Sequence, residues 1–311
     1  MRDDRERQGG EGEAGGDAVA PYRPLLFSIA YRMLGSVMDA EDIVQETFLR
    51  WQQADRAAVA LPKAYLTTVV TRLCIDHLRS ARIQREEYAG PWLPEPLATE
   101  GNVADTSAPV LADSLSLAFL VLLESLNPVE RAVFLLHDVF AYSYDEIAAI
   151  VGKSAPTCRQ IAVRARRAVQ ARRPRFTPSS TQREHLTRRF VQASTEGDMP
   201  ALLALLADDV IAWTDGGGKV SAARRPIHGA INVARYLLGI RVKAPGAVSR
   251  LCWINGQPGL VAEVAGEVVA AGALEIAGER IAAIYVVANP DKLHGLALGL
   301  SHPGSVGRLL S

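Results

Sequence analysis

The segment DGGGK, residues 215–219, places three glycines between the carboxylate of Asp215 and the amine of Lys219. A glycine-rich loop with a lysine binds phosphate when it has the form G-x-x-x-x-G-K-[ST] and opens a helix after a strand. Here Lys219 is followed by Val220, and the earlier glycine of that motif is missing. The segment therefore does not fit a nucleotide site, and its glycines predict a flexible connection next to a strand.

The composition predicts a multidomain protein of the cytoplasm. The chain has 311 residues, 49% of them apolar, which is enough for two or three domains. It contains no run of eighteen apolar residues that would predict a membrane span. Residues 1–19 are charged and glycine-rich, which indicates a disordered tail rather than a secretion signal. The three isolated cysteines fit a reducing compartment and predict neither disulfides nor a metal site, and no motif indicates a cofactor.

The periodicity along the chain predicts two helical modules followed by an α+β domain. We expect a helical module at 20–88, a proline-containing linker at 89–112, a second helical module at 113–173 and a short linker at 174–182. We expect an α+β domain at 183–293, with helices at 183–196 and 199–207, and a tail at 294–311. The glycine-bounded segments VIAW, LCWI, LVAEVAG, VVAAGALEI and RIAAIYVVA predict the strands of a curled antiparallel sheet.

Residues 142–170 have the pattern of a helix-turn-helix. Ser143 and Glu146 form a capping box, Gly152 ends the first helix, and Ser154 caps a second helix that carries Pro156 in its first turn. From Lys153 to Arg175 there are eight basic residues and no acidic one. A helical wheel places an apolar face inward and a basic face outward, which predicts DNA binding rather than a solvated surface. The candidate DNA-binding residues are Thr157, Arg159, Gln160, Arg164 and Arg167.

The segment DAEDIVQETFLRW, residues 39–51, predicts a helix with an acidic outer face around an exposed leucine. That face, formed by Asp39, Asp42, Gln45, Glu46 and Leu49, suits an arginine-rich protein partner. The following helix carries Arg72, Arg79 and Arg82 at spacings of seven and three. His77, on the same helix, is expected to be a half-buried packing residue rather than a ligand.

These motifs, together with PKAYLTTVVTRLCIDHLRSAR and LNPVERAVFLLHDVFAYSYDEIAAIVGKSAPTCRQIAVRARRAV, strongly resemble bacterial sigma factors of the extracytoplasmic-function (ECF) class. The resemblance covers roughly residues 20–88 and 113–172. It implies a non-enzymatic transcription factor whose partners are core RNA polymerase, through its β′ coiled coil and β flap, and promoter DNA. It implies that the 39–51 helix docks on the β′ coiled coil. The helix carrying Arg72, Arg79 and Arg82 would read and open the −10 element, and the 157–167 helix would enter the major groove at the −35 element.

The C-terminal domain resembles the SnoaL-like domains of the NTF2-like superfamily, in which helices wrap a cone of curved sheet. Three motifs resemble those of ECF sigma factors with a fused SnoaL-like extension, in which the extension regulates the sigma core. They are WLPEP (Trp92, Leu93, Pro94, Glu95, Pro96), DGGGK (Asp215, Gly216, Gly217, Gly218, Lys219) and NPDKL (Asn289, Pro290, Asp291, Lys292, Leu293). As a specific contact between them, we expect an ion pair between Glu95 and Lys219.

Two alternative functions stay open at this point. SnoaL-like domains include enzymes, and Trp213, Asp215, His228 and Arg235 are the side chains that could serve one, although no paired carboxylates or His/Asp spacing supports catalysis. The chain could thus be an enzyme tethered to a DNA-binding module, or a helix-turn-helix repressor with a small ligand in the cone. A polymerase-docking face argues against a repressor. We therefore expect no catalytic residues, and a sigma factor controlled in cis by its C-terminal domain.

Overall fold

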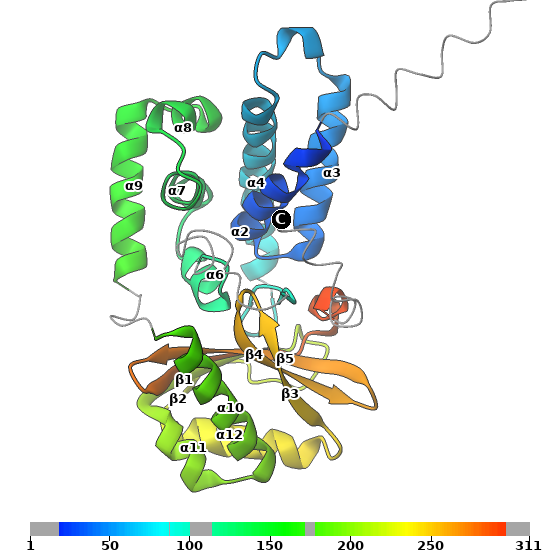
Figure 1. Ribbon diagram of the computed structural model, residues 1–311, viewed down its shortest axis with the longest axis vertical. Coiled ribbons are helices and arrows are strands. Elements are labelled where there is room, and N and C mark those ends of the chain that lie inside the picture. The colour runs from blue at the N-terminus through cyan, green and yellow to red at the C-terminus, as the bar shows by residue number, and fades with distance from the viewer. Residues whose placement is uncertain (1–18, 87, 100–113, 172–177, 297–311) are drawn as a thin grey trace, which may run out of the picture.

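The computed structural model describes residues 19–86, 88–99, 114–171 and 178–296. Figure 1 shows two groups of helices side by side above a sheet that has its own helices on the far face. This is the expected arrangement of two helical modules and an α+β domain. The described part of the chain includes no helix with the length and hydropathy to cross a membrane.

The first helical module packs three main helices around an apolar core. It comprises η1 (Ala20–Tyr22), α2 (Arg23–Leu34), α3 (Val37–Gln53), η2 (Arg56–Ala58) and α4 (Pro62–Glu86). Gly35 ends α2 with φ +69°, a conformation that glycine adopts without strain. Ser36 caps α3 by accepting a hydrogen bond from the amide of Asp39. The face of α3 opposite the predicted acidic face packs inward, with Ala40, Ile43, Val44, Thr47 and Trp51 buried and Phe48 half-buried.

The second helical module contains α6 (Leu117–Leu123), α7 (Pro128–Phe134), the π-helix η4 (Leu135–Val139), α8 (Tyr144–Val151) and α9 (Ala155–Gln170). One continuous apolar cluster joins it to the first module. The two modules therefore pack as one body, and in Figure 1 α7 and α8 lie beside α4.

The C-terminal domain is a six-stranded sheet with three helices on one face. Its elements are α10 (Ser180–Glu196), α11 (Met199–Leu205), β1 (Leu206–Asp215), β2 (Ile227–His228), α12 (Ala230–Lys243), β3 (Val248–Ile254), β4 (Gln257–Val264), β5 (Glu267–Ala277), β6 (Arg280–Val287) and η5 (Pro290–Lys292). The strand order is β2-β1-β6-β5-β4-β3, and all neighbours are antiparallel except β1 and β6. The strands β3 and β2 are therefore the two edges of the sheet.

The two faces of this sheet pack against different parts of the chain. Alternate side chains such as Ile276 and Ile284 face α10, α11 and α12 and form the core of the cone. The opposite side chains, among them Ala273 and Tyr285, pack against the linker, α6 and the segment after η5. The outer face of the sheet is thus covered by the rest of the same chain.

Several expected boundaries were wrong. Residues Ser180–Gln182, assigned to the second linker, form the first turn of α10, because Ser179 caps that helix by accepting from the amide of Gln182. The second helix of the domain ends at Leu205, and β1 takes the next residues. Val19 and Leu296, assigned to the terminal tails, are buried, and Leu296 has 0% exposure. The remainder of both tails, 1–18 and 297–311, and linker residues 100–112 lie outside the described residues.

Candidate functional site

The helix-turn-helix is formed by α8, a short turn and α9, with the predicted caps. The Ser143 amide donates to Glu146 Oε2 at 2.8 Å, and the Glu146 amide donates to Ser143 Oγ at 3.3 Å. Gly152 ends α8 with φ +67°. Ser154 caps α9, and Pro156 occupies its first turn. The predicted capping box, turn and cap are all confirmed.

The exposed face of α9 carries every residue predicted to contact DNA. Cys158, Ile161, Ala162, Ala165 and Val169 are buried against the module, as the helical wheel predicts. On the other side, the side chains of Thr157, Arg159, Gln160, Arg164 and Arg167 are exposed. Arg166, at the edge of this face, donates to Asp138 Oδ1 at 2.7 Å, so its guanidinium forms an ion pair within the second helical module. The structure therefore presents a basic helix face with the polar side chain of Gln160 in its first half.

The acidic helix α3 presents part of its predicted face to solvent. Asp42, Gln45 and Leu49 are exposed, and Leu49 has 51% exposure, which is high for a large apolar side chain. Asp39 and Glu46 are partly buried. His77 is half-buried, as predicted, and its Nε2 lies 3.5 Å from Asp39 Oδ2.

The three arginines of α4 do not form one free stripe. Arg72 donates to the backbone carbonyls of Ile150 at 2.8 Å and Ala149 at 3.0 Å, at the C-terminal end of α8. Those carbonyls carry the negative end of the helix dipole, so a guanidinium is a favourable partner. Arg79 pairs with Asp76 on its own helix, and the side chain of Arg82 lies outside the described residues. The candidate −10 residue Arg72 is thus bound to the second helical module.

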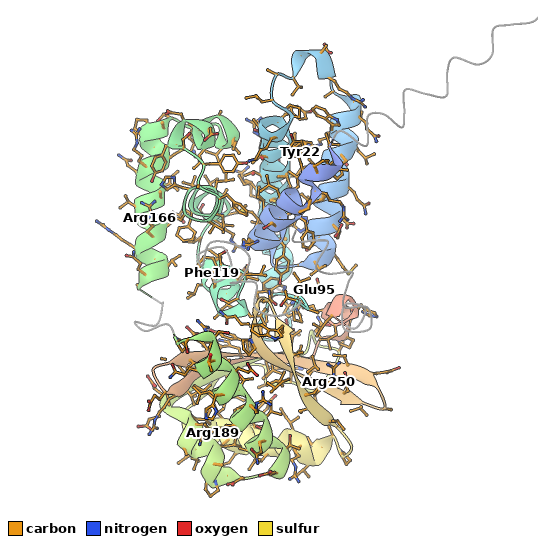
Figure 2. The ribbon with its side chains drawn as sticks, viewed as in Figure 1. Tyr22, Glu95, Phe119, Arg166, Arg189 and Arg250 are labelled. Atoms are coloured by element: carbon orange, nitrogen blue, oxygen red, sulfur yellow. The ribbon has the colours of Figure 1, made fainter. Side chains whose placement is uncertain are left out.

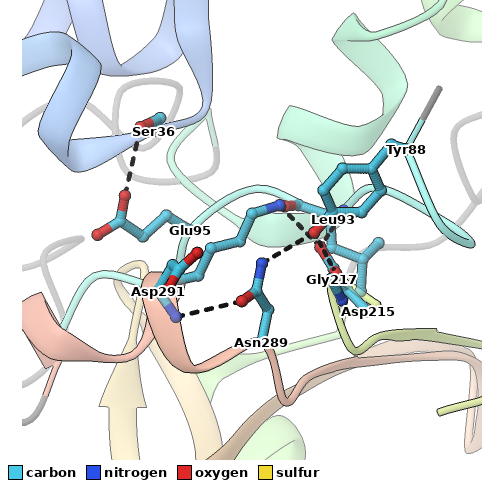
Figure 3. Close-up of polar contacts among 9 residues, drawn as sticks. Ser36, Tyr88, Leu93, Glu95, Asp215, Gly217, Asn289 and Asp291 are labelled. Carbon is cyan, nitrogen blue, oxygen red and sulfur yellow. Dashed lines mark hydrogen bonds and ion pairs between the residues drawn. The ribbon is translucent and has the colours of Figure 1, made fainter. Parts of the chain in front are cut away.

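The three interdomain motifs meet around the carboxylate of Asp215, which has 0% exposure. Its Oδ1 accepts from the Tyr88 hydroxyl at 2.6 Å and from the Gly217 amide at 3.0 Å. Its Oδ2 accepts from the Leu93 amide at 2.9 Å and from Lys292 Nζ at 2.7 Å. Figure 3 shows these groups gathered between the linker and the C-terminal domain. Two of the four donors, Tyr88 and Leu93, come from the segment between α4 and α6, so this buried carboxylate attaches that segment to the domain.

Lys292 completes the cluster from the NPDKL motif. Its Nζ also donates to the Leu93 carbonyl at 2.6 Å and lies 4.2 Å from the ring centroid of Trp92. An ammonium over an aromatic face is stabilised by the ring quadrupole. Asn289 donates to the Tyr88 hydroxyl at 2.9 Å. Burial, reinforced by the neighbouring Asp215, raises the pKa of Tyr88 well above its ordinary value, which keeps the hydroxyl protonated as a donor.

The glycines of DGGGK are needed for close approach. Gly217 and Gly218 have φ of +60° and +72°, which favours glycine. A Cβ at Gly217 would overlap the amide of Asn289, and one at Gly218 would lie 3.1 Å from Cβ of Ala89. The loop therefore lets its backbone approach the linker and the NPDKL motif.

Glu95 connects the same linker to the first helical module. Its side chain is 3% exposed, and its Oε2 accepts from the Val37 amide at 2.7 Å, in the first turn of α3. The Tyr31 hydroxyl donates to the Glu95 carbonyl at 2.7 Å. Burial raises the pKa of Glu95, while hydrogen bonds from the amides of Val37 and Met38 oppose that rise. In Figure 2, Glu95 lies where the helical modules meet the C-terminal domain.

The expected pair between Glu95 and Lys219 is wrong. Lys219 Nζ instead lies 2.6 Å from Asp291 Oδ2, in an exposed ion pair within the C-terminal domain. Glu95 points the other way, toward the start of α3, where backbone amides and the helix dipole stabilise it. The buried lysine of the junction is Lys292, and its carboxylate partner is Asp215.

The residues that could have served an enzyme do not converge. Trp213 stacks on Tyr285 on the outer face of the sheet, with ring centroids 5.2 Å apart. Asp215 has its oxygens occupied by the junction, whereas His228 and Arg235 are exposed. The described residues include no group of three or more His, Cys, Asp or Glu side chains placed to hold a metal. The side chains inside the cone pack against one another as an apolar core, and this packing does not support the hypothesis of a small ligand there.

Comparison with known proteins assigns the family. The model of sigma-70 region 2 matches residues 18–83, and that of sigma-70 region 4 matches residues 116–169. The ECF RNA polymerase sigma factor SigJ of Mycobacterium tuberculosis is 38% identical over 301 residues, which cover 92% of this chain and 95% of that protein. This chain belongs to the ECF sigma factors. Its two helical modules are sigma regions 2 and 4, and it is a promoter-directing initiation factor rather than an enzyme.

Two further comparisons show that this chain is similar to sigma factors in the C-terminal domain as well as in the helical modules. The probable ECF sigma factor SigI of M. tuberculosis is 34% identical over 278 residues, 88% of this chain and 93% of that protein. The crystal structure of SigJ superposes with a TM-score of 0.73 at 36% identity and covers 90% of this chain and 98% of that one. The whole three-part architecture is therefore similar to that of SigJ.

Sequence reasoning missed two residues of the sigma factor's junction. Tyr88 lies just before the WLPEP motif. The only sequence signal for a role in the junction was an aromatic residue at the end of a helical segment. Asn255, at the tip of the β3–β4 hairpin, is fully buried against the linker and both helical modules. The dipeptide Asn-Gly is typical of a tight hairpin turn, but it carries no signal that the asparagine is buried.

We predict that Asp215→Asn destabilises the sigma factor by about 3–5 kcal/mol, because it removes the carboxylate that pairs directly with the largely buried Lys292. Asp291→Asn is the matched control. It removes the exposed partner of Lys219 and is expected to cost less than about 1 kcal/mol. Urea unfolding of both full-length variants measures the difference, and equal losses would contradict the assignment.

We predict that the stability of the wild-type protein relative to Glu95→Gln rises as the pH is lowered from 7 toward 5. Because the pKa of Glu95 is raised in the folded state, folding favours the protonated form. The stability that protonated Glu95 contributes is fully present below the pKa of this group in the unfolded chain. It is lost as the pH rises through its pKa in the folded protein. Thermal midpoints of both proteins across this pH range test the sign, and a constant difference would show that Glu95 does not titrate abnormally.

Proposed function

We propose that the C-terminal domain controls this sigma factor in cis by holding the linker against the start of α3. The observation that carries the proposal is the short path between the two contacts. The Leu93 amide is bound by Asp215 of the C-terminal domain, and two residues later Glu95 accepts from Val37 of α3. The contact of Leu93 with the C-terminal domain is therefore only two residues along the chain from the contact of Glu95 with the first helical module.

The helix that the linker contacts, α3, carries the proposed polymerase-docking face. We assign Asp39, Asp42, Gln45, Glu46 and Leu49 to contact with the β′ coiled coil, and the second helical module to the β flap. Exposed acids around Leu49 favour a basic partner with an apolar contact at its centre. Because Glu95 contacts the first turn of the same helix, release of the linker alters the end of the docking face that contains Asp39.

Promoter binding is proposed to require the two helical modules to separate. We assign Thr157, Arg159, Gln160, Arg164 and Arg167 of α9 to the −35 element and Arg72, Arg79 and Arg82 of α4 to the −10 element. These elements lie about 25 base pairs apart, which is roughly 85 Å of duplex. In the described arrangement Arg72 is bound to α8 of the other module, so it cannot reach DNA with the same two donors. The described arrangement is therefore proposed to be a resting form of a factor that acts in the cytoplasm.

We predict that variants of the junction change promoter-dependent transcription by core RNA polymerase, whereas a matched surface variant does not. Run-off assays on a promoter selected in vitro would compare full-length wild type, Asp215→Asn, Lys292→Gln and the control Asp208→Asn, which changes an exposed carboxylate of the same domain outside the three motifs. The direction of the change in the first two variants gives the sign of control. Wild-type yields from both junction variants would refute control through this site.

We predict that Arg164→Gln weakens binding at the −35 element by roughly 10- to 100-fold if it reads a base, and also relaxes sequence preference there. If Arg164 contacts only phosphate, binding weakens on all sequences. The slope of the logarithm of the binding constant against the logarithm of the salt concentration then becomes shallower by about one. Arg188→Gln, on the exposed surface of α10, is the control for loss of a positive charge. Unchanged affinity of Arg164→Gln would remove this residue from the interface.

A further inference from the structure

The edge of the C-terminal sheet is extended by the linker. The strand β3 is an edge strand, and residues 97–99 pair with its end in antiparallel fashion. The Thr99 amide donates to the Trp253 carbonyl at 3.0 Å, and the Asn255 amide donates to the Leu97 carbonyl at 2.8 Å. A polypeptide that adds to a sheet edge in this way gains its affinity from main-chain hydrogen bonds. The linker is thus held by the β3–β4 hairpin independently of the Asp215 cluster.

Asn255, at the tip of that hairpin, bonds to all three remaining parts of the molecule. Its Oδ1 accepts from the Leu97 amide of the linker at 3.0 Å. Its Nδ2 donates to the Tyr31 hydroxyl of the first helical module at 2.6 Å and to the Leu115 carbonyl at the start of the second at 2.9 Å. The residue has 0% exposure, so no water completes these bonds from outside.

The requirements of the turn itself do not explain this burial. Asn255 and Gly256 have φ of +54° and +72°, a pair that suits the tight turn between two antiparallel strands. The next hairpin of the same sheet has Ala265 and Gly266 with φ of +52° and +84°, and there both residues are exposed. The turn can therefore form without an asparagine, whereas the three side-chain bonds cannot.

We propose that Asn255 is a positioning residue through which the C-terminal domain fixes the two helical modules relative to one another. It holds Tyr31 of α2 and Leu115 before α6 on one side-chain amide, so the two modules cannot separate without breaking at least one of these bonds. The inference rests on the proposed control in cis, and it adds a second route for that control, which is distinct from the Asp215 cluster.

The contacts between the modules show what this positioning would control. Arg131 of α7 donates to the Met33 carbonyl at 2.6 Å, near the C-terminal end of α2, and Arg72 of α4 donates to the C-terminal end of α8. Each module thus places an arginine on a helix end of the other. Met33 lies two residues after Tyr31, so Asn255 holds the same end of α2 that Arg131 caps. When Asn255 releases Tyr31 and Leu115, the modules are still held by these exchanged arginines, by the apolar cluster and by the bonds of Arg32 to Ser114 and of Thr67 to Tyr142.

The test measures the distance between the helical modules in the full-length protein without polymerase. Spin labels would be placed at the exposed residues Gln53 and Lys153, one in each module, with Cys252 replaced by Ser and Cys74 and Cys158 left buried. Double electron–electron resonance would compare wild type, Asn255→Gly and Ala265→Gly. Glycine keeps the positive φ in both variants, so only the side-chain bonds of Asn255 are lost.

We expect Asn255→Gly to increase the population of separated modules on the order of tenfold, the effect of losing buried hydrogen bonds, and Ala265→Gly to match wild type. An unchanged distance distribution in Asn255→Gly would overturn the proposal. If that variant does not fold, Tyr31→Phe, which deletes the hydroxyl that accepts from Asn255 and donates to the Glu95 carbonyl, is expected to give a change in the same direction. An unchanged distance distribution in that variant would also overturn the proposal. Because the distance is read without polymerase, a shift with wild-type transcription would refute control in cis while leaving the positioning role intact.

Discussion

A buried carboxylate is stable only when each of its oxygens has donors, and Asp215 obtains half of its donors from outside its own domain. This requirement determines where the linker runs. Tyr88 and Leu93 must reach β1, which brings Trp92 over Lys292 and against the turn at Gly35. Glu95 then arrives at the start of α3. The position of the segment from Tyr88 to Leu93 therefore follows from satisfying one buried charge, and the β3–β4 hairpin holds the residues after Glu95.

The interface among the modules combines a large apolar cluster with a few polar groups that are also well hydrated when free. Arg72, Arg131 and Asn255 donate mainly to backbone carbonyls, and all three can exchange those acceptors for water or another partner. Such contacts make the interface specific in the closed arrangement, and their acceptors can be replaced when it opens. This suits a factor whose modules are proposed to act at two separate DNA elements.

The sequence predicted the parts of the molecule that depend on local chemistry. The helix-turn-helix followed from Ser143, Gly152 and Ser154, because caps and a left-handed glycine specify helix ends wherever they occur. The inward faces of α3 and α9 followed from helical periodicity. The partners of Lys219 and Lys292 could not be predicted in this way, because several acids lie within reach and only the three-dimensional path of the linker selects among them. The same holds for Asn255, whose turn is a local property and whose burial depends on residues more than a hundred positions away.

The pairing of residues 97–99 with β3 also bears on the solubility of the sigma factor. An uncovered edge strand offers unpaired backbone groups to any extended polypeptide, including a second copy of the same chain. In the resting arrangement the linker occupies part of this edge. A molecule whose linker has left β3 therefore exposes a site for intermolecular strand pairing. The pairing of the linker with β3 therefore also limits association between copies of the chain through this edge.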